Sequence, residues 1–290
     1  MLPTPSALPT VLIIGGPDVD LRLEIMERLR SDFEMMAAGS LSELQQKFAA
    51  SGFRYFSYPL SRRVNPMADL NTVVYLRRLC QELRPQIVHT FDAKEGVWGR
   101  VAARWAGVPV VIGTLPGLGS LYASDDLSTR MVRAIYQPLQ RWACQISELT
   151  IFQNRDDARQ FVKAGVVAER KAVIIPGSGV STEIYAPARV SEVERRRLRE
   201  ELGIGPEEIV VTMISRVIRT KGVPEFMAAA RQVRDRHPPA RFLLIGPDDQ
   251  DSLDRMSAAE LAELKQVVTW PGARRDVPRS EEHTSELQSR

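Results

Sequence analysis

The sequence has few of the residues that cross-link small proteins or bind metals. Its 290 residues include two cysteines, Cys80 and Cys144, and three histidines. The two cysteines lie far apart and fit no zinc-binding or redox spacing. We therefore expect neither a disulfide framework nor a metal site, and we interpret both cysteines as buried thiols of a protein in a reducing compartment.

Long hydrophobic runs are absent as well. The apolar run near the N-terminus covers residues 11–14 and follows no basic segment, which fits neither a signal peptide nor a transmembrane helix. The formal net charge of +3 is too small to indicate binding to nucleic acid, although it permits contact with an anionic substrate or membrane surface. We expect a cytoplasmic protein that at most binds the inner face of the membrane.

Short apolar runs alternate with longer helical patterns along most of the chain. This alternation predicts an α/β fold in which helices cover both faces of parallel sheets. Met35, Met36 and the four tryptophans are expected in the core, and the charged helix 192–201 is expected to face solvent. The predicted strands are residues 11–14, 33–38, 53–58, 86–90, 108–112, 149–152, 173–175, 209–214, 241–245 and 267–270, and the predicted helices are residues 67–83, 96–105, 127–144, 155–164, 193–202, 224–236 and 258–265.

A change in amino-acid composition separates two domains. Residues 175–190 are rich in Gly, Pro and Ser and have no hydrophobic period, which is typical of a linker. We predict a first α/β domain over residues 1–180 and a second over residues 181–278. At about five residues per strand and a dozen per helix, the second domain is only about half complete.

The last twelve residues, RSEEHTSELQSR at positions 279–290, differ from everything before them. They contain one Leu among polar and charged residues, which is too little apolar surface to order the segment. The run resembles the translation of a sequencing-adapter oligonucleotide. We interpret it as a non-native tail, and the alternative is an ordinary polar C-terminus.

The sharpest chemical signal lies in the second domain. The predicted strand 209–214 ends at Ser215 and Arg216, and Lys221 precedes Gly222 at the start of the next helix. Ligands of open parallel sheets bind beyond the carboxyl ends of the strands, and a helix N-terminus attracts phosphate. A guanidinium and an ammonium at this place suit a diphosphate. The alternative is that Arg216 and Lys221 are two solvated surface cations.

The segment that carries this signal, SRVIRTKGVPEFMAAARQVRDRHPPARFLLIG, resembles the donor-domain motif of family 4 glycosyltransferases. Members are retaining, nucleotide-sugar-dependent enzymes with the GT-B fold, which consists of two Rossmann-like domains with parallel sheets. The resemblance implies that Arg216 and Lys221 hold the donor diphosphate and act in catalysis. The segment VVTWPGARRDVP resembles the next block of the family and implies that Gly272 lies near the nucleotide.

The resemblance extends to the first domain. The segment IVHTFDAKEGVWGRVAARWAGVPVVIGTLPGLGS resembles the acceptor-domain core of members that extend polysaccharides or lipid-linked glycans, and VIIPGSGVSTEIYAP resembles the inter-domain segment. Two departures matter. The Glu-x7-Glu segment of the family, which contacts the sugar and ribose, is not found after Pro278, and we interpret this as a C-terminal truncation. The loop after the strand 108–112 has no histidine, so no catalytic histidine is named there.

Five weaker candidates follow predicted strands. Gly15 and Gly16 follow the first strand, where the resemblance implies close approach of the backbone to the donor diphosphate; the alternative is a tight turn. His89 ends a strand and is an acceptor-side candidate, although a lone histidine is usually structural. Gly117 and Gly119 are candidates for an acceptor loop, and the alternative is a plain turn.

The resemblance thus implies a glycosyltransferase that moves a hexosyl unit from a nucleotide diphosphate sugar to a glycan or lipid-linked acceptor with retention. The nucleotide sugar is a substrate, and no cofactor is expected. The truncated chain itself is expected to be inactive. Two alternatives stay open: a nucleotide-sugar epimerase on the same fold, which needs carboxylates and a histidine, and an inert fragment that binds sugar nucleotides.

Overall fold

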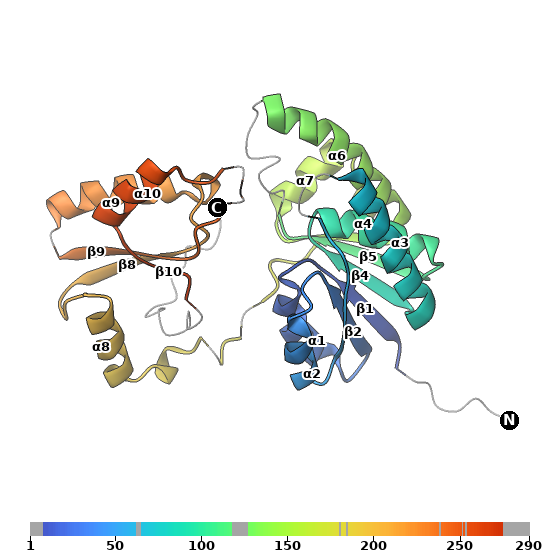
Figure 1. The fold of residues 1–290 in the computed structure, drawn as a ribbon, viewed down its shortest axis with the longest axis horizontal. Helices are drawn as coiled ribbons and strands as arrows, with labels where there is room; N and C mark the ends of the chain where they lie inside the picture. The colour runs from blue at the N-terminus through green and yellow to red at the C-terminus, as the bar shows by residue number, and fades with distance from the viewer. Residues whose placement is uncertain are drawn as a thin grey trace. The chain divides into compact units, whose positions relative to one another are not determined.

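The computed structural model describes residues 8–61, 65–117, 127–179, 181–183, 185–237, 239–250, 252 and 254–274. Gly119 and the predicted tail at 279–290 lie outside these ranges. The chain divides into two compact units, Met1–Gly179 and Val180–Arg290 (Figure 1).

The first unit is built on a parallel sheet of seven strands. Their order is β3-β2-β1-β4-β5-β6-β7, so the chain starts in the middle of the sheet, builds one half and then crosses over to build the other. Neighbouring strands pair in parallel throughout. The strands are β1 (Thr10–Ile14), β2 (Glu34–Gly39), β3 (Arg54–Ser57), β4 (Ile87–Phe91), β5 (Val110–Leu115), β6 (Leu149–Phe152) and β7 (Ala172–Ile174).

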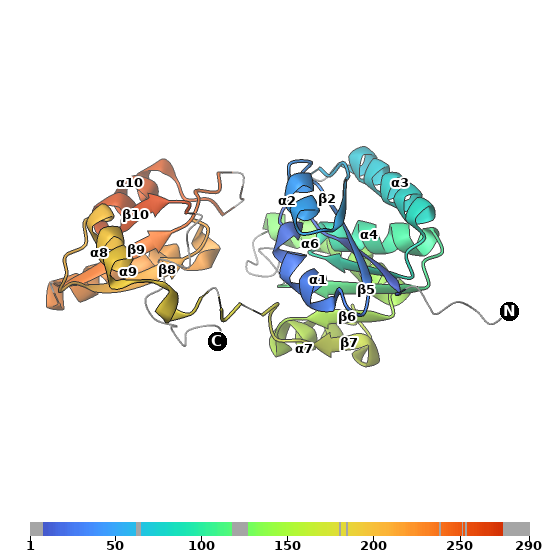
Figure 2. The same ribbon diagram turned by 90° about the horizontal axis from the view of Figure 1, so that it is seen from below.

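Helices cover both faces of this sheet. One face packs against α3, α4 and α6 through a core that includes Leu12, Met36 and Val88, and the other packs against α1 and α2 through a core that includes Ile13 and Met35 (Figure 2). The helices are α1 (Leu23–Leu29), α2 (Leu44–Ala50), α3 (Pro66–Leu83), α4 (Lys94–Trp105), α6 (Leu127–Ile146) and α7 (Arg155–Lys163), with 3-10 turns η1 (Val19–Arg22) and η2 (Glu169–Lys171).

Local sequence explains the best-defined helix ends. Asn65 caps α3 by accepting the backbone N–H of Ala68, and Pro66 occupies the first helical position. Asn154 caps α7 in the same way, as the sequence predicts, by accepting from Asp157. The sequence analysis does not predict the short helices α1 and α2, because seven residues give too few turns for a clear hydrophobic period.

The second unit contains a smaller parallel sheet with the order β10-β9-β8. Its core joins Phe242 and Leu244 of the middle strand to Met227 and Leu264 of the helices on one face. Figure 1 shows α8 on the opposite side of this sheet from α9 and α10. The elements are η3 (Pro187–Arg189), α8 (Glu192–Glu201), β8 (Ile209–Ile214), η4 (Arg219–Lys221), α9 (Val223–Arg236), β9 (Ala240–Ile245), α10 (Ala258–Val267) and β10 (Thr269–Gly272).

Most burial expectations are confirmed, and one is wrong. Cys80 and Cys144 are buried free thiols, and Met35 and Met36 are in the core. Trp105, in contrast, has half of its side chain exposed. It ends α4 at the margin of the helix layer, where its ring lies against Trp142 of α6. No helix in the described ranges is long and apolar enough to cross a membrane.

Candidate functional site

The carboxyl end of β8 carries Arg216 in the second unit, as the sequence predicts. Its guanidinium pairs with the carboxylate of Asp249, at 2.6 Å between Nη1 and Oδ2. Asp249 follows the neighbouring strand β9, so the parallel sheet brings the two side chains together across 33 positions of sequence. About half of the Arg216 side chain stays exposed. Sequence reasoning missed this carboxylate, because nothing local marks it as a partner.

Lys221 lies between β8 and α9. It ends the 3-10 turn η4, and Gly222 follows with φ +81° as the N-cap of α9, so only a residue tolerant of left-handed backbone suits this turn. The side chain of Lys221 is exposed and has no ion pair among the described residues. The neighbouring Arg219 is already engaged by Glu260 at 2.6 Å. Lys221 is therefore a cation at the positive end of a fourteen-residue helix.

Two glycines shape the same edge of the small sheet. Gly246 follows β9 with φ +155°, and a Cβ atom there would lie 1.7 Å from the carbonyl oxygen of Ser215. Gly272 ends β10 with φ +86°, and its carbonyl accepts the N–H of Gly246 at 3.0 Å. A pocket of about 160 Å³ opens at these strand ends and is lined by Ile214, Ser215, Ile245, Gly246, Pro247, Ala273 and Arg274.

The first unit gathers its own set of candidates at the carboxyl ends of its central strands. Gly15 and Gly16 follow β1, His89 lies near the end of β4, and Gly117 follows β5. These strands are neighbours in the sheet, so the four residues share one edge. Gly16 lies directly beside the start of α4, since a Cβ atom there would lie 2.8 Å from the Glu95 carboxylate.

Two carboxyl groups that the sequence analysis left unassigned lie at this edge. Asp92 follows β4 with a left-handed φ of +72°, a conformation that is uncommon outside glycine and concentrates at functional sites. Burial, with the nearby Asp18 charge, raises the pKa of Asp92 to about 6. Burial also raises the pKa of Glu95 to about 7, and the charges of Asp92 and Asp18 add to the effect. Both groups thus titrate near neutral pH, where they donate or accept hydrogen bonds to hydroxyl groups.

His89 is better suited to a supporting role. Its Nε2 lies 2.7 Å from Oγ1 of Thr114, and its ring stacks on Phe91. Burial lowers the pKa of His89 to about 4, and the charge of Arg22 adds to this, so the ring is neutral near pH 7. The Arg22 guanidinium lies over the same Phe91 ring and donates a hydrogen bond to Oγ of Ser178 at 2.7 Å.

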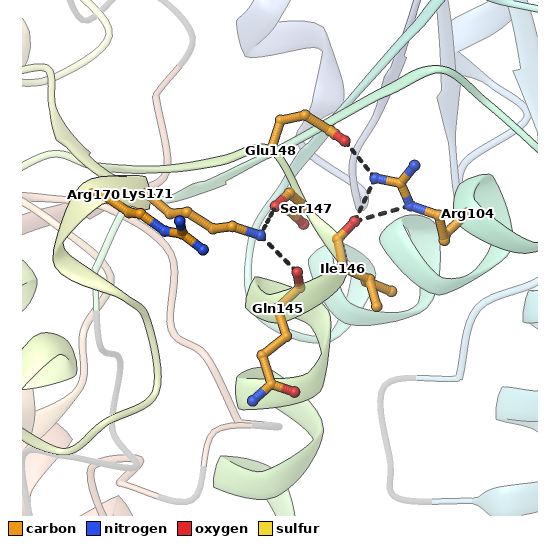
Figure 3. A pocket seen from close by; sticks show the side chains of 7 residues that line it. All are labelled: Arg104, Gln145, Ile146, Ser147, Glu148, Arg170 and Lys171. Atoms are coloured by element: carbon orange, nitrogen blue, oxygen red, sulfur yellow. Dashed lines mark hydrogen bonds and ion pairs between the residues drawn. The ribbon is translucent and has the colours of Figure 1, made fainter.

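A further pocket lies at the opposite edge of the first sheet, away from these candidates. It has a volume of about 580 Å³, and Figure 3 shows Arg104 and Lys171 pointing at the backbone carbonyls where α6 ends. Lys171 donates to the carbonyls of Gln145 and Ser147, and Arg104 donates to that of Ile146 and pairs with Glu148. The arrangement satisfies the orphan carbonyls of a helix C-terminus, so we interpret it as structural.

Comparison with known proteins agrees with this division of the molecule. Residues 22–177 match the family model described as "Glycosyl transferase 4-like domain", and residues 194–280 match "Glycosyl transferases group 1".

Two curated relatives are each 28% identical to the chain. The N,N'-diacetylbacillosaminyl-diphospho-undecaprenol alpha-1,3-N-acetylgalactosaminyltransferase of Campylobacter jejuni aligns with 91% of this chain and 68% of its own length. The UDP-Gal:alpha-D-GlcNAc-diphosphoundecaprenol alpha-1,3-galactosyltransferase of Escherichia coli aligns with 77% of this chain and 56% of its own length. The chain therefore spans roughly half to two thirds of these relatives.

Solved structures share the fold at low sequence identity. A glycosyltransferase from Rickettsia africae superposes with a TM-score of 0.69 at 14% identity, over 96% of this chain and 71% of the other. A UDP-GlcNAc 2-epimerase from Neisseria meningitidis superposes with a TM-score of 0.61 at 12% identity, over 93% of this chain and 74% of the other. The first family model alone covers more than half of the 290 residues, and the chain belongs to the GT-B-fold glycosyltransferases with a glycosyl transferase 4-like domain.

Proposed function

We propose that this chain carries the donor and acceptor sides of a glycosyltransferase that moves a hexosyl unit from a nucleotide diphosphate sugar to a lipid-linked glycan, with retention of anomeric configuration. The observation that carries the proposal is the pair Arg216 and Lys221 at a strand end and a helix start, within a segment that matches a glycosyltransferase family model. The lipid-linked acceptor is supported by the two curated relatives, whose names specify undecaprenyl diphosphate-linked sugars.

On the donor side, Arg216 and Lys221 would stabilise the charge that develops on the leaving diphosphate as the glycosidic bond breaks. Such preorganised donors are each worth about 3–4 kcal/mol of barrier in other enzymes. Asp249 now neutralises the Arg216 guanidinium, so a diphosphate must displace that carboxylate or share the cation with it. Gly272 and the adjacent small pocket would lie next to the nucleotide.

On the acceptor side, Asp92 and Glu95 would bind sugar hydroxyl groups. Gly16, which has no side chain, leaves space for the Glu95 carboxylate beside the loop after β1. His89 and Gly117 would line the same edge. We further propose that the 290-residue chain binds a nucleoside diphosphate without completing transfer. The carboxylates that the family uses to orient the donor sugar are not in its sequence, and chemistry requires a reactive geometry.

One observation supports a second candidate, a nucleotide-sugar epimerase on the same fold. Asp92, Glu95 and the neutral His89 give the first unit the carboxyl and imidazole groups that such a reaction needs. Incubation of a nucleotide sugar with and without lipid-linked acceptor separates the candidates. A transferase forms a new product only with acceptor, whereas an epimerase converts the sugar without it.

The donor assignment is tested by calorimetric titration of the chain with UDP and GDP. Arg216→Ala and Lys221→Ala should each weaken binding of the preferred nucleotide at least tenfold. Asp249→Asn should tighten it severalfold, because the competing carboxylate becomes neutral. In a version extended to the length of the relatives, each alanine variant should cut turnover by about 10²-fold or more.

Arg236→Ala is the matched control, since this exposed arginine lies at the opposite end of α9 from Lys221. It should bind the nucleotide like the unmodified chain. Wild-type affinity in both Arg216→Ala and Lys221→Ala would overturn the diphosphate assignment.

A further inference from the structure

The outer surface of α3, α4 and α6 exposes an unusual number of large apolar side chains. These three helices pack on one face of the seven-stranded sheet, with α4 in contact with both α3 and α6. We call their solvent-facing surface the α3–α4–α6 face. Its exposed apolar residues are Met67, Leu70, Val74, Tyr75, Trp105, Met131 and Ile135.

Helical periodicity places these side chains away from the sheet. In α6, Gln140, Ala143 and Cys144 are buried against the rest of the unit, whereas Met131 and Ile135 lie on the opposite side of the helix and are each about two-thirds exposed. In α3, buried and exposed residues divide in the same way, with Leu76, Leu79 and Cys80 inside and Met67, Leu70 and Val74 outside.

The charges on this face have predominantly one sign. The sequence of α6 contains Arg130, Arg133 and Arg141 and no acidic residue, and α3 exposes Arg77 and Arg78 beside one exposed acidic residue, Glu82. The helix α8 of the second unit, by contrast, has four Glu and four Arg in ten residues. The α3–α4–α6 face therefore combines arginines with exposed apolar side chains, whereas a solvated helix such as α8 carries positive and negative charges in equal number.

The face also exposes Trp105, the last residue of α4. Its ring lies against Trp142 of α6 with centroids 6.1 Å apart, while Trp98 and Trp142 are partly buried against the core. A half-exposed indole is typical of surfaces that meet lipid headgroups, because one end of the ring is apolar and the other donates a hydrogen bond.

We propose that the α3–α4–α6 face docks on the surface of a bilayer that contains anionic phospholipid. Apolar side chains would enter the headgroup boundary while arginines meet lipid phosphates. A second copy of the chain suits the face poorly, because a twofold interface would bring arginines against arginines.

The docking geometry also serves the first unit's candidate site. In a parallel sheet the connecting helices run back against the strands, so the N-terminal halves of α3 and α6 lie toward the strand carboxyl ends. Met67, Leu70, Met131 and Ile135 are in those halves, on the side of Asp92 and Glu95. Docking would hold that edge close to the headgroups, where a lipid-linked sugar is exposed. Membrane docking by this face agrees with a lipid-linked acceptor and does not depend on Arg216 or Lys221 binding the donor.

Flotation of the full chain with vesicles tests the proposal. Vesicles of phosphatidylcholine with about 30% phosphatidylglycerol should carry the protein to the top of the gradient, and vesicles of phosphatidylcholine alone should carry much less. The double variant Met131→Ser/Ile135→Ser should lose most of the binding. Arg78→Ser/Arg141→Ser should weaken it by roughly an order of magnitude or more, and salt should weaken binding of the unmodified chain.

Leu21→Ser/Val193→Ser is the matched apolar control, since both side chains are well exposed on other elements. Arg196→Ser/Arg197→Ser on α8 is the matched charge control. Both controls, and Arg216→Ala, should float like the unmodified chain, so failure of the donor assignment leaves this result intact. Absence of flotation, equal loss in a control, or a dimer in solution that the Met131/Ile135 variant converts to monomer would overturn the proposal.

Discussion

The strands β1 and β8 open the two units with almost the same kind of sequence, TVLII and IVVTMI, yet they end in different environments. Four of the five residues of β1 are buried, because it lies between β2 and β4 with helices on both faces. None of the six residues of β8 is fully buried, and no strand among the described residues pairs with its outer edge. Apolar sequence selects a strand, and burial depends on the neighbours that the fold provides.

This contrast predicts that the second unit is the weaker one. We expect two unfolding steps in denaturant, with the second unit losing protection against hydrogen exchange first.

The largest effect should come from Gly246→Ala in the second unit. A Cβ atom at this position would lie 1.7 Å from the Ser215 carbonyl oxygen, so the loops after β8 and β9 must separate. We expect a loss of more than about 4 kcal/mol, enough to unfold this unit. Hydrogen exchange should show full loss of protection in β8 and β9 and unchanged protection in β1 and β4.

Gly205→Ala is the control for that experiment, because its Cβ atom would meet Glu208 at an ordinary contact distance of 3.5 Å. It should leave both units protected. Retained protection in β9 of the Gly246→Ala chain would show that the two strand-end loops are not held together as described.

A smaller effect of opposite sign is expected from Glu95→Gln in the first unit. Burial raises the pKa of Glu95 from 4.5 to about 7, so the folded state holds a proton that the unfolded state releases between these values. The ionised carboxylate therefore destabilises the unit above about pH 7 and costs nothing below about pH 4. The glutamine should stabilise the unit at pH 8 by an amount on the order of 3 kcal/mol, and the gain should fade on acidification.

Urea denaturation followed at pH 8 and pH 4 measures this gain. Glu34→Gln, an exposed glutamate at the start of β2, should give no comparable pH-dependent change. A gain from Glu95→Gln that is equal at both pH values would contradict the raised pKa.

The smallest change in stability, but a visible change in solution behaviour, is expected from Thr212→Lys on β8. A lysine on an unpaired edge strand opposes pairing with another chain. Folding stability should stay within about 0.5 kcal/mol, while light scattering at high protein concentration should fall. Ala229→Lys on the exposed side of α9 adds the same charge off the edge and should leave scattering unchanged. Equal scattering in all three chains would show that the β8 edge does not drive association.

Much of the fold could be predicted because its signals are local. Two predicted strands, residues 149–152 and 209–214, have the bounds of β6 and β8, and the Asn154 cap is where the sequence places it. Other predicted strands have different ends in the structure. The strand predicted at residues 108–112 is β5 at Val110–Leu115, because Val108 is buried in the connection between α4 and the strand.

The candidate site divides in the same manner. Arg216 and Lys221 could be identified from their positions beside a strand end and a helix start. Asp249, Asp92 and Glu95 could not, because their importance comes from contacts with Arg216, Asp18 and Gly16 that lie far away in sequence.

By itself, the sequence determined that this protein alternates strands and helices, that it forms two α/β units, and that a cation pair stands where a parallel sheet binds anions. Only the tertiary structure decided which carboxylates titrate near neutral pH, which arginine is already paired, and which apolar side chains of α3, α4 and α6 meet solvent. The physical reason is that secondary structure follows from residues within one or two turns of each other. Burial, charge pairing and pKa shifts depend instead on strand order, which places distant segments side by side.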